Sequence, residues 1–337
     1  MAYRPWGSLD WALQLTAPRR WSFVGALGTE QRSLGAWRWL RELDLLGSNH
    51  LLEILDAPSR HTTRARQLLA EREQEFRNLG GNGSDIQRSL RLMNEFHRVD
   101  AIARSIEATG GEAHEAPSSL ILDITSLPKR YFFPFLRLFE KSERIRDLVI
   151  TYTSPESYVE HEPLSEGATD WLNLPGFRGA ESNREMLIVS VGFMVESLQN
   201  HVGTISNHES VKMLIPFPAP LPVLRRTWDS VYCIESNREP GKFENHRVDT
   251  ADMPEAFARI VSFDRNPEVT PAFAPFGPKP ISAAICLFAS QRESTVYYPQ
   301  PRIYHPDYSK GIGKVDGKDA VFAYWTKHDG ERLYRLP

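Results

Sequence analysis

Continuous apolar runs, separated by segments with helical patterning, make up the first half of the chain. These runs lie at residues 21–27, 51–56, 119–124 and 147–152. Runs of Val, Ile and Leu without polar alternation are typical of strands buried on both faces of a parallel sheet. Residues 62–78 and 85–109 repeat apolar side chains at helical spacing. The pattern therefore predicts an α/β unit with a helical insert.

The second half of the chain passes through the same patterns in the same order. Its apolar runs lie at residues 186–191, 211–216, 270–275 and 295–298, and its helical segments at residues 222–232, 253–263 and 281–290. The offset between matched residues shrinks steadily along the chain, as expected of a collinear duplication with shorter inserts in the second copy. The sequence therefore predicts an α/β fold of two tandem Rossmann-like units with parallel sheets, related by internal duplication.

Domain boundaries follow from the extent of this repeat. Residues 1–20 precede it and are predicted to form an N-terminal extension, and residues 21–175 form the first unit with its helical insert. Residues 176–185 are rich in Gly and polar side chains, which is typical of a linker. Residues 186–337 then form the second unit and a C-terminal tail.

Composition and charge narrow the class of protein. The chain has 337 residues, of which 41% are hydrophobic and 25% charged, enough for two globular domains. A formal charge of −3 argues against binding chiefly to a nucleic-acid backbone, although a local basic patch leaves direct nucleic-acid contact open. The two cysteines, the absence of an apolar leader and the absence of an 18-residue apolar run predict a cytoplasmic protein outside the membrane.

The predicted topology places candidate ligand contacts on loops that follow strands. Parallel sheets bind ligands beyond the carboxyl ends of their strands, at the topological switch point. Gly28 and Gly192 follow the first run of each copy, where a missing side chain lets the backbone approach an anion. Lys129 and Lys279 follow the third run and suit a phosphate contact. The alternative for each lysine is a solvated side chain beside a proline that starts a helix.

Other candidates lie on the same loops or near strand ends. The complete predicted ligand-binding set is Gly28, Glu30, Arg32, Thr125, Lys129, Gly192, Gly277, Lys279, Tyr152 and Tyr298. The two tyrosines of this set, together with Tyr158 and Tyr304, either stack on a base or pack as half-buried residues at strand edges. The sequence leaves both alternatives open.

One of these loops resembles a known family. The segment 123–129, Asp-Ile-Thr-Ser-Leu-Pro-Lys, is similar to the strand followed by Thr-x-x-x-Lys in CRISPR-associated Rossmann-fold (CARF) domains, although it lacks their usual Gly-Gly. The segment 274–279 is a looser version that keeps the lysine. Two such units in one chain also resemble SAVED, a fused pair of CARF-like units in bacterial anti-phage signalling.

The resemblance implies a function in defence signalling. It implies that an anionic nucleotide, such as a cyclic oligonucleotide, binds between the two units. Because the 337 residues carry no effector nuclease domain, it also implies that a partner effector or a larger defence complex supplies the output. The chain would then be a nucleotide-sensing or scaffold component.

An enzymatic alternative stays open beside this interpretation. The chain has no Gly-x-Gly-x-x-Gly, no Walker-type loop, no Gly-x-Ser-x-Gly elbow and no His-x-x-x-His, so the sequence predicts no cofactor and no metal and leaves any catalytic residue unknown. A nucleotide- or RNA-processing enzyme would use Glu30 or Asp123 as acid or base in the same cleft. The lack of a nucleophile–base pair favours binding over turnover.

A second pattern with catalytic precedent is an Arg-x5-His spacing within a predicted helix. Arg91 and His97 fall in the predicted helix 85–109 and resemble the spacing of HEPN ribonucleases. Six residues of an α-helix place the two side chains about 120° apart around the axis, which suits a shared site poorly. The pattern therefore favours two side chains on a solvated helix face.

Overall fold

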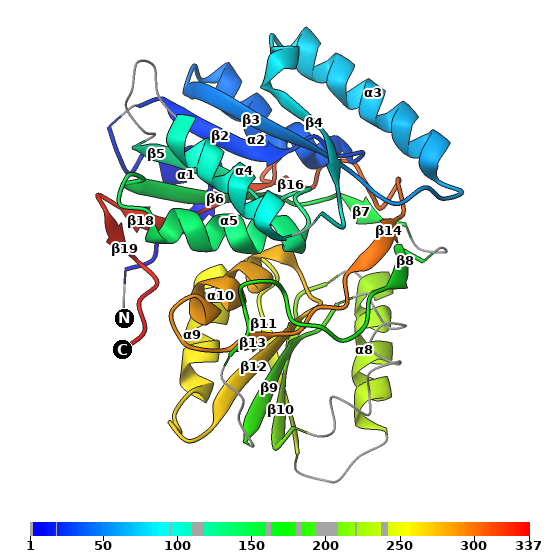
Figure 1. The fold of residues 1–337 in the computed structure, drawn as a ribbon, viewed down its shortest axis with the longest axis vertical. Coiled ribbons are helices and arrows are strands. Elements are labelled where there is room, and N and C mark those ends of the chain that lie inside the picture. Colours follow the sequence, from blue (N-terminus) through cyan, green and yellow to red (C-terminus); the bar gives the residue numbers. More distant parts are fainter. Residues whose placement is uncertain are drawn as a thin grey trace. The chain divides into compact units, whose positions relative to one another are not determined.

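Two compact units, each built on a parallel-containing sheet, make up the structure (Figure 1). The computed structural model describes residues 3–17, 19–94, 96–109, 118–159, 163–179, 184–192, 208–219, 221–236 and 242–337. Unit 1 comprises residues 1–166 and 302–333, and unit 2 comprises residues 167–301 and 334–337. The chain therefore leaves unit 1 once and returns to it before it ends in unit 2.

The main sheet of unit 1 contains strands from both of its segments, residues 1–166 and 302–333. Its strands are β1 (Trp6–Ser8), β2 (Trp21–Ala26), β3 (Leu46–Leu55), β4 (Ile86–Arg91), β5 (Ser119–Asp123), β6 (Asp147–Thr153), β18 (Val321–His328) and β19 (Glu331–Arg332). They lie in the order β4-β3-β2-β5-β6-β18-β1, with β19 beside β18. Strands β2 to β6 are parallel to one another, whereas β18 is antiparallel to β6, with Val321 opposite Thr153.

Helices cover this sheet and join its strands. They are α1 (Leu9–Leu13), the 3-10 helix η1 (Gln31–Leu34), α2 (Gly35–Glu42), α3 (Thr62–Asn78), the 3-10 helix η2 (Gly83–Asp85), α4 (Phe96–Thr109) and α5 (Lys129–Lys141). Helices α4 and α5 pack side by side (Figure 1). Helix α3 meets α2 through the rings of Phe76 and Trp37, whose centroids are 4.7 Å apart. The core centres on β2, β5 and β6, which are buried along their whole length, with apolar side chains in their middle and polar ones mostly near their ends.

Unit 2 has a smaller sheet that is parallel throughout. Its strands are β9 (Glu185–Ser190), β10 (Ser210–Pro216), β11 (Phe243–Val248), β12 (Thr270–Pro275) and β13 (Thr295–Val296), in the order β11-β10-β9-β12-β13. Its described helices are α8 (Leu221–Glu235), α9 (Met253–Phe263) and α10 (Lys279–Ala289). Helices α9 and α10 pack together, and α10 contributes a nearly continuous run of buried side chains.

Short two-stranded sheets form beside the two larger ones. They are β7 (Ser157–Tyr158) with β15 (Ser309–Lys310), β8 (Ser165–Ala168) with β14 (Pro301–Tyr304), and β16 (Lys314–Val315) with β17 (Lys318–Asp319). Among the described residues, no helix has the length and apolar character needed to cross a membrane.

The predicted α/β class with parallel strands is confirmed, but one predicted helix is wrong. Residues 85–109 form strand β4 and then helix α4 instead of one helix. Arg91 ends the strand and His97 lies in the first turn of the helix, so the two residues do not share a helix face. Strand β4 has only two buried apolar residues, Ile86 and Leu90, and their spacing of four positions also fits a helix.

The predicted domain boundaries also need correction. Residues 1–20 are part of unit 1, because β1 pairs with β18 and Leu9 packs in the core. Residues 302–333 belong to unit 1 as well, since β18 extends its sheet beside β6. The predicted linker, residues 176–185, lies within unit 2.

Candidate functional site

In both sheets the strand order reverses at the same point, between the first and the fourth parallel strand. Counted along the chain, the five parallel strands of each unit lie in the order third, second, first, fourth, fifth. The switch points are therefore between β2 and β5 in unit 1 and between β9 and β12 in unit 2. The loops that follow these strands are the places where parallel sheets of this order bind ligands. The predicted glycine loops and Pro-Lys loops lie at these positions.

In unit 1 the two switch-point loops touch each other. A Cβ atom on Gly28 would lie 2.8 Å from Cβ of Ser126, so a larger residue would collide with the loop after β5. The Ser33 hydroxyl donates to the carbonyl oxygen of Gly28 at 3.4 Å. Gly28 thus provides space for the neighbouring loop, a packing reason for glycine that exists without any ligand.

Unit 2 repeats this contact in a tighter form. A Cβ atom on Gly192 would lie 2.2 Å from the carbonyl oxygen of Phe276, and one on Gly277 would lie 2.0 Å from Oγ of Ser190. The structure brings Gly192 and Gly277 together, as the prediction of one shared site requires. The Ser190 hydroxyl is buried and has no hydrogen-bond partner among the described residues.

The two predicted lysines occupy the same position in their helices. Lys129 is the first residue of α5 after Pro128, and Lys279 is the first residue of α10 after Pro278. They differ in burial, because Lys129 is only 7% exposed whereas Lys279 is half-buried. A half-buried ammonium group at a helix start suits contact with an anion, while a buried one is also part of the packing.

Thr125 faces the interior of unit 1. It is 0% exposed, its hydroxyl donates to Asp123 Oδ1 at 2.6 Å, and it accepts the backbone N–H of Thr153 at 2.9 Å. Asp123 Oδ1 also accepts the Thr151 hydroxyl at 3.0 Å. Asp123 therefore holds the loop after β5 and its neighbour β6 in place, a structural role that the sequence had left open beside an acid–base role.

Glu30 and Arg32 form an ion pair with each other and bond to other residues of unit 1. Arg32 is 3% exposed and its guanidinium lies 2.9 Å from Glu30 Oε2. It also donates to the Thr153 carbonyl at 3.0 Å and to the Ser309 hydroxyl at 3.1 Å. Burial opposes the charged guanidinium, but the Glu30 carboxylate together with Tyr152 and Tyr158 outweighs burial, and the pKa of Arg32 is raised. Ligand contact by this pair stays a prediction, and it would require these bonds to open.

A segment of the returning chain lies over the carboxyl ends of unit 1. We call residues 304–311 the strap. Its Pro306 carbonyl accepts the Thr29 hydroxyl at 2.7 Å, and its Gly311 N–H donates to Gln31 at 3.1 Å. Its Tyr304 N–H donates to the carboxylate of Asp56 at 2.6 Å. Because these partners follow β2 and β3, the strap fills the edge where a ligand of unit 1 was expected.

Of the tyrosines predicted as stacking candidates, Tyr152 and Tyr298 are buried, and Tyr158 and Tyr304 are half-buried. Tyr152 lies at the end of β6 beneath Arg32, whose Cζ is 5.6 Å from the ring centroid. Tyr298 packs against Phe276 at 6.1 Å between ring centroids. Both follow the packing alternative. Tyr304 and Tyr158 also lie in unit 1, where each ring packs against Tyr308.

Sequence reasoning missed a group of titratable side chains beside the strap. Asp56 follows β3, and burial raises its pKa to about 6. The rings of His61 and His305 have centroids 5.0 Å apart, and His61 Nε2 lies 3.3 Å from Glu166. The sequence signal for Asp56 was its place at the end of the apolar run 51–56. The two histidines are far apart in the chain, so no local sequence pattern indicates their contact.

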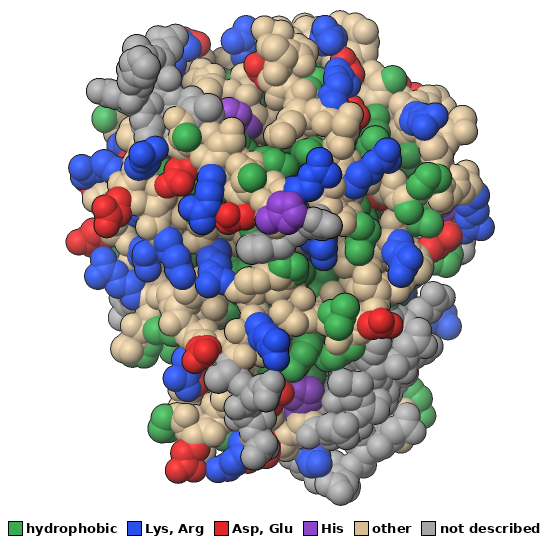
Figure 2. Space-filling model, in the orientation of Figure 1, with side chains coloured by type: hydrophobic (Ala, Val, Ile, Leu, Met, Phe, Trp, Pro, Cys, Tyr) green, Lys and Arg blue, Asp and Glu red, His purple; other side chains and the backbone are tan. Residues whose placement is uncertain are grey.

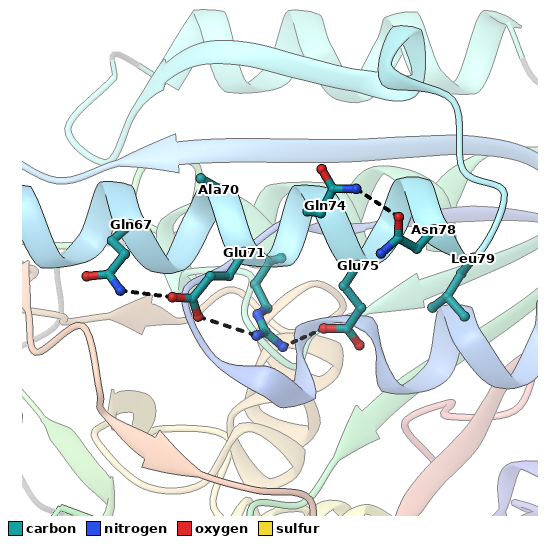
Figure 3. A pocket seen from close by; sticks show the side chains of 8 residues that line it. Gln67, Ala70, Glu71, Gln74, Glu75, Asn78 and Leu79 are labelled. Carbon is teal, nitrogen blue, oxygen red and sulfur yellow. Dashed lines mark hydrogen bonds and ion pairs between the residues drawn. The ribbon is translucent and has the colours of Figure 1, made fainter.

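A shallow depression on α3 lies apart from these loops (Figure 3). It is lined by Gln67, Ala70, Glu71, Arg72, Gln74, Glu75, Asn78 and Leu79. Its polar side chains bond to each other along the helix, for example Gln67 to Glu71 at 3.0 Å and Gln74 to Asn78 at 2.8 Å. These pairs are typical of a solvated helix face.

Neither the surface charge nor the described metal-ligating side chains point to a particular ligand site. Basic and acidic side chains are interspersed over the face drawn in Figure 2, in line with the formal charge of −3. The described ranges hold no group of three or more His, Cys, Asp or Glu side chains suited to a metal ion. No protein-family model matches the chain, and no curated protein matches its sequence.

Proposed function

We propose that the chain is a duplicated pair of Rossmann-like units that binds an anionic nucleotide and acts through a partner. The observation that carries the proposal is the shared design of the two switch points. Each unit has the same strand order, a glycine after its first strand, and a Pro-Lys helix start after its fourth. Agreement in all three features supports a common design of the two units.

The strands that the sequence pattern did not reveal support the duplication. Strand β4 in unit 1 and strand β11 in unit 2 each form the third strand and the end of the parallel series. Both are rich in exposed polar residues. The agreement therefore extends to elements that played no part in finding the repeat.

The ligand class follows from the chemistry of the loops. Lys279 offers a cation at the start of α10, beside helix N–H groups that favour an anion. The likeness of segment 123–129 to CARF loops extends the proposal to a cyclic oligonucleotide and to a sensing or scaffold role in bacterial anti-phage defence, in the cytoplasm. The proposed output lies on an effector protein or a larger complex. That Lys129 and Lys279 share one cleft stays a prediction.

Titration of the purified full chain with ATP and with cyclic di-, tri- and tetra-adenylate tests this function. Calorimetry should detect binding of at least one of these nucleotides, and mass spectrometry should recover it intact. Binding of none would refute the proposed function. Conversion of a bound nucleotide into product would replace sensing with catalysis.

Lys279→Ala provides the residue-level test of the same proposal. Loss of a charge-assisted contact should weaken nucleotide binding by roughly 1.5–3 kcal/mol. Lys318→Ala is the matched control, since Lys318 is an exposed lysine paired with Asp10 at 3.1 Å. Lys129→Ala is a poorer probe, because Lys129 is buried and its loss also removes packing.

A second candidate function is nucleotide processing in unit 1. The observations in its favour are Asp56, which accepts the N–H of Tyr304 directly after β3, and the paired rings of His61 and His305, the residue next to Tyr304. An acid with a pKa of about 6 and two imidazoles suit general acid–base chemistry. The product analysis above decides between the candidates, and Asp56→Asn should abolish any turnover that it reveals.

A further inference from the structure

Unit 2 presents an exposed aromatic ring at the carboxyl edge of its sheet. Phe217 directly follows β10 and is 43% exposed. Strand β10 is the second strand of its sheet, so Phe217 holds the position that Asp56 holds after β3 in unit 1. This edge is where ligands of parallel sheets bind.

A cation accompanies the ring. The guanidinium carbon of Arg247, in β11, lies 5.0 Å from the centroid of the Phe217 ring. Arg247 is exposed, and no described residue forms an ion pair or hydrogen bond with its guanidinium. Its positive charge is therefore available to an anionic ligand that reaches the ring.

The backbone holds this pair in a fixed place. The Phe217 N–H donates to the Val248 carbonyl at 2.8 Å, which joins the ends of β10 and β11. The Thr250 hydroxyl donates to the Pro218 carbonyl at 3.1 Å, which joins the next residues of both loops. The ring, on the residue after β10, and the guanidinium, near the end of β11, are thus held by strand ends and loops that are bonded to each other.

We propose that Phe217 and Arg247 form a contact site for one nucleotide moiety of the ligand, with the base stacked on the Phe217 ring and a phosphate beside Arg247. This inference rests on the proposed function and adds a subsite to it. Aromatic rings accept any base because every base has a π face, and a neighbouring arginine supplies charge. The site therefore selects for a base-bearing anion over a base-free one.

The experiment compares ATP and cyclic tri-adenylate with inorganic tripolyphosphate, which carries charge but no base. Calorimetry on the full chain should show that Phe217→Ala weakens binding of the adenylates about tenfold or more and leaves tripolyphosphate unchanged. Phe217→Trp should keep adenylate affinity because it keeps an aromatic ring. Arg247→Gln should weaken all three anions.

Tyr232→Ala is the matched control. Tyr232 is an even more exposed aromatic residue, at 73%, but it lies near the far end of α8, roughly 16 Å along the helix from its start. Equal adenylate affinity of Phe217→Ala and wild type would overturn this subsite while the proposed function stands. Failure of the wild type to bind any adenylate would overturn both.

Discussion

The carboxyl edges of the two units share a strand order and differ in what occupies them. In unit 1 the strap fills the edge, and Glu30, Arg32 and Asp56 bond to the chain itself. In unit 2 the corresponding edge carries the exposed Phe217 and Arg247. The position directly after the second strand therefore serves stability in unit 1, and we propose that it serves ligand binding in unit 2.

The largest expected effect comes from Arg32, because unit 1 depends on it for its own edge. Arg32→Met would leave the Glu30 carboxylate, which is only 13% exposed, without its cation. Breaking a buried ion pair on one side costs about 3–5 kcal/mol of unfolding free energy. Urea unfolding followed by circular dichroism measures this loss.

The double variant Arg32→Met with Glu30→Gln is the control for charge. It should recover part of the stability, because no buried charge is left unpaired. An Arg32→Met protein as stable as the wild type would show that the edge of unit 1 does not depend on this pair.

The next effect compares the two switch-point glycines. Gly192→Ala places a methyl group 2.2 Å from a backbone carbonyl oxygen, whereas Gly28→Ala places one 2.8 Å from Cβ of Ser126, which is a less severe overlap. We expect losses of about 3 kcal/mol for Gly192→Ala and about 1 kcal/mol for Gly28→Ala. Unfolding midpoints of the two variants measure the difference, and the reverse order would contradict the packing described for unit 2.

The smallest effect is a pH dependence in unit 1. Burial raises the pKa of Asp56 from 3.8 to about 6, so the folded protein holds this proton more tightly than the unfolded chain. Stability from this group is present below about pH 4 and is lost as pH rises to about 6. The shift of about two pKa units corresponds to at most about 3 kcal/mol, and solvent screening of the half-buried carboxylate reduces this value. Asp56→Asn should therefore be close to the wild type at pH 4 and exceed its unfolding free energy by about 1 kcal/mol at pH 7.

Thermal melts across pH 4 to 7 test this prediction against the wild type. Asparagine keeps an oxygen that can accept the Tyr304 N–H, so the strap should stay attached in the variant. A difference between the two proteins that grows toward low pH would contradict the raised pKa.

The sequence predicted the central strands because burial on both faces leaves a continuous apolar run. Strand β12 and helices α3 and α9 have the predicted bounds, residues 270–275, 62–78 and 253–263. Strands β4 and β11 escaped because they lie at the end of the parallel series and carry polar side chains. Strand β18 has an apolar run that the repeat did not include, and its pairing with β6 joins distant parts of the chain.

The candidate site was predictable in position and less so in role. The loops of Gly28, Gly192 and Lys279 follow from strand ends, which a local pattern marks. The roles of Arg32 and Thr125 depend on contacts with Thr153, which is 121 residues from Arg32 and 28 residues from Thr125 in the chain. A single sequence gives no signal for such contacts, so residues expected to face a ligand proved to hold the fold together.

Hydrogen exchange of the full chain with and without cyclic tri-adenylate tests the difference between the two edges most directly. We predict that the nucleotide slows exchange in residues 217–219, 248–250 and 276–280 of unit 2 and leaves the strap, residues 304–311, unchanged. Slower exchange confined to the strap and to the loops after β2 and β3 would place the ligand in unit 1 and contradict this account.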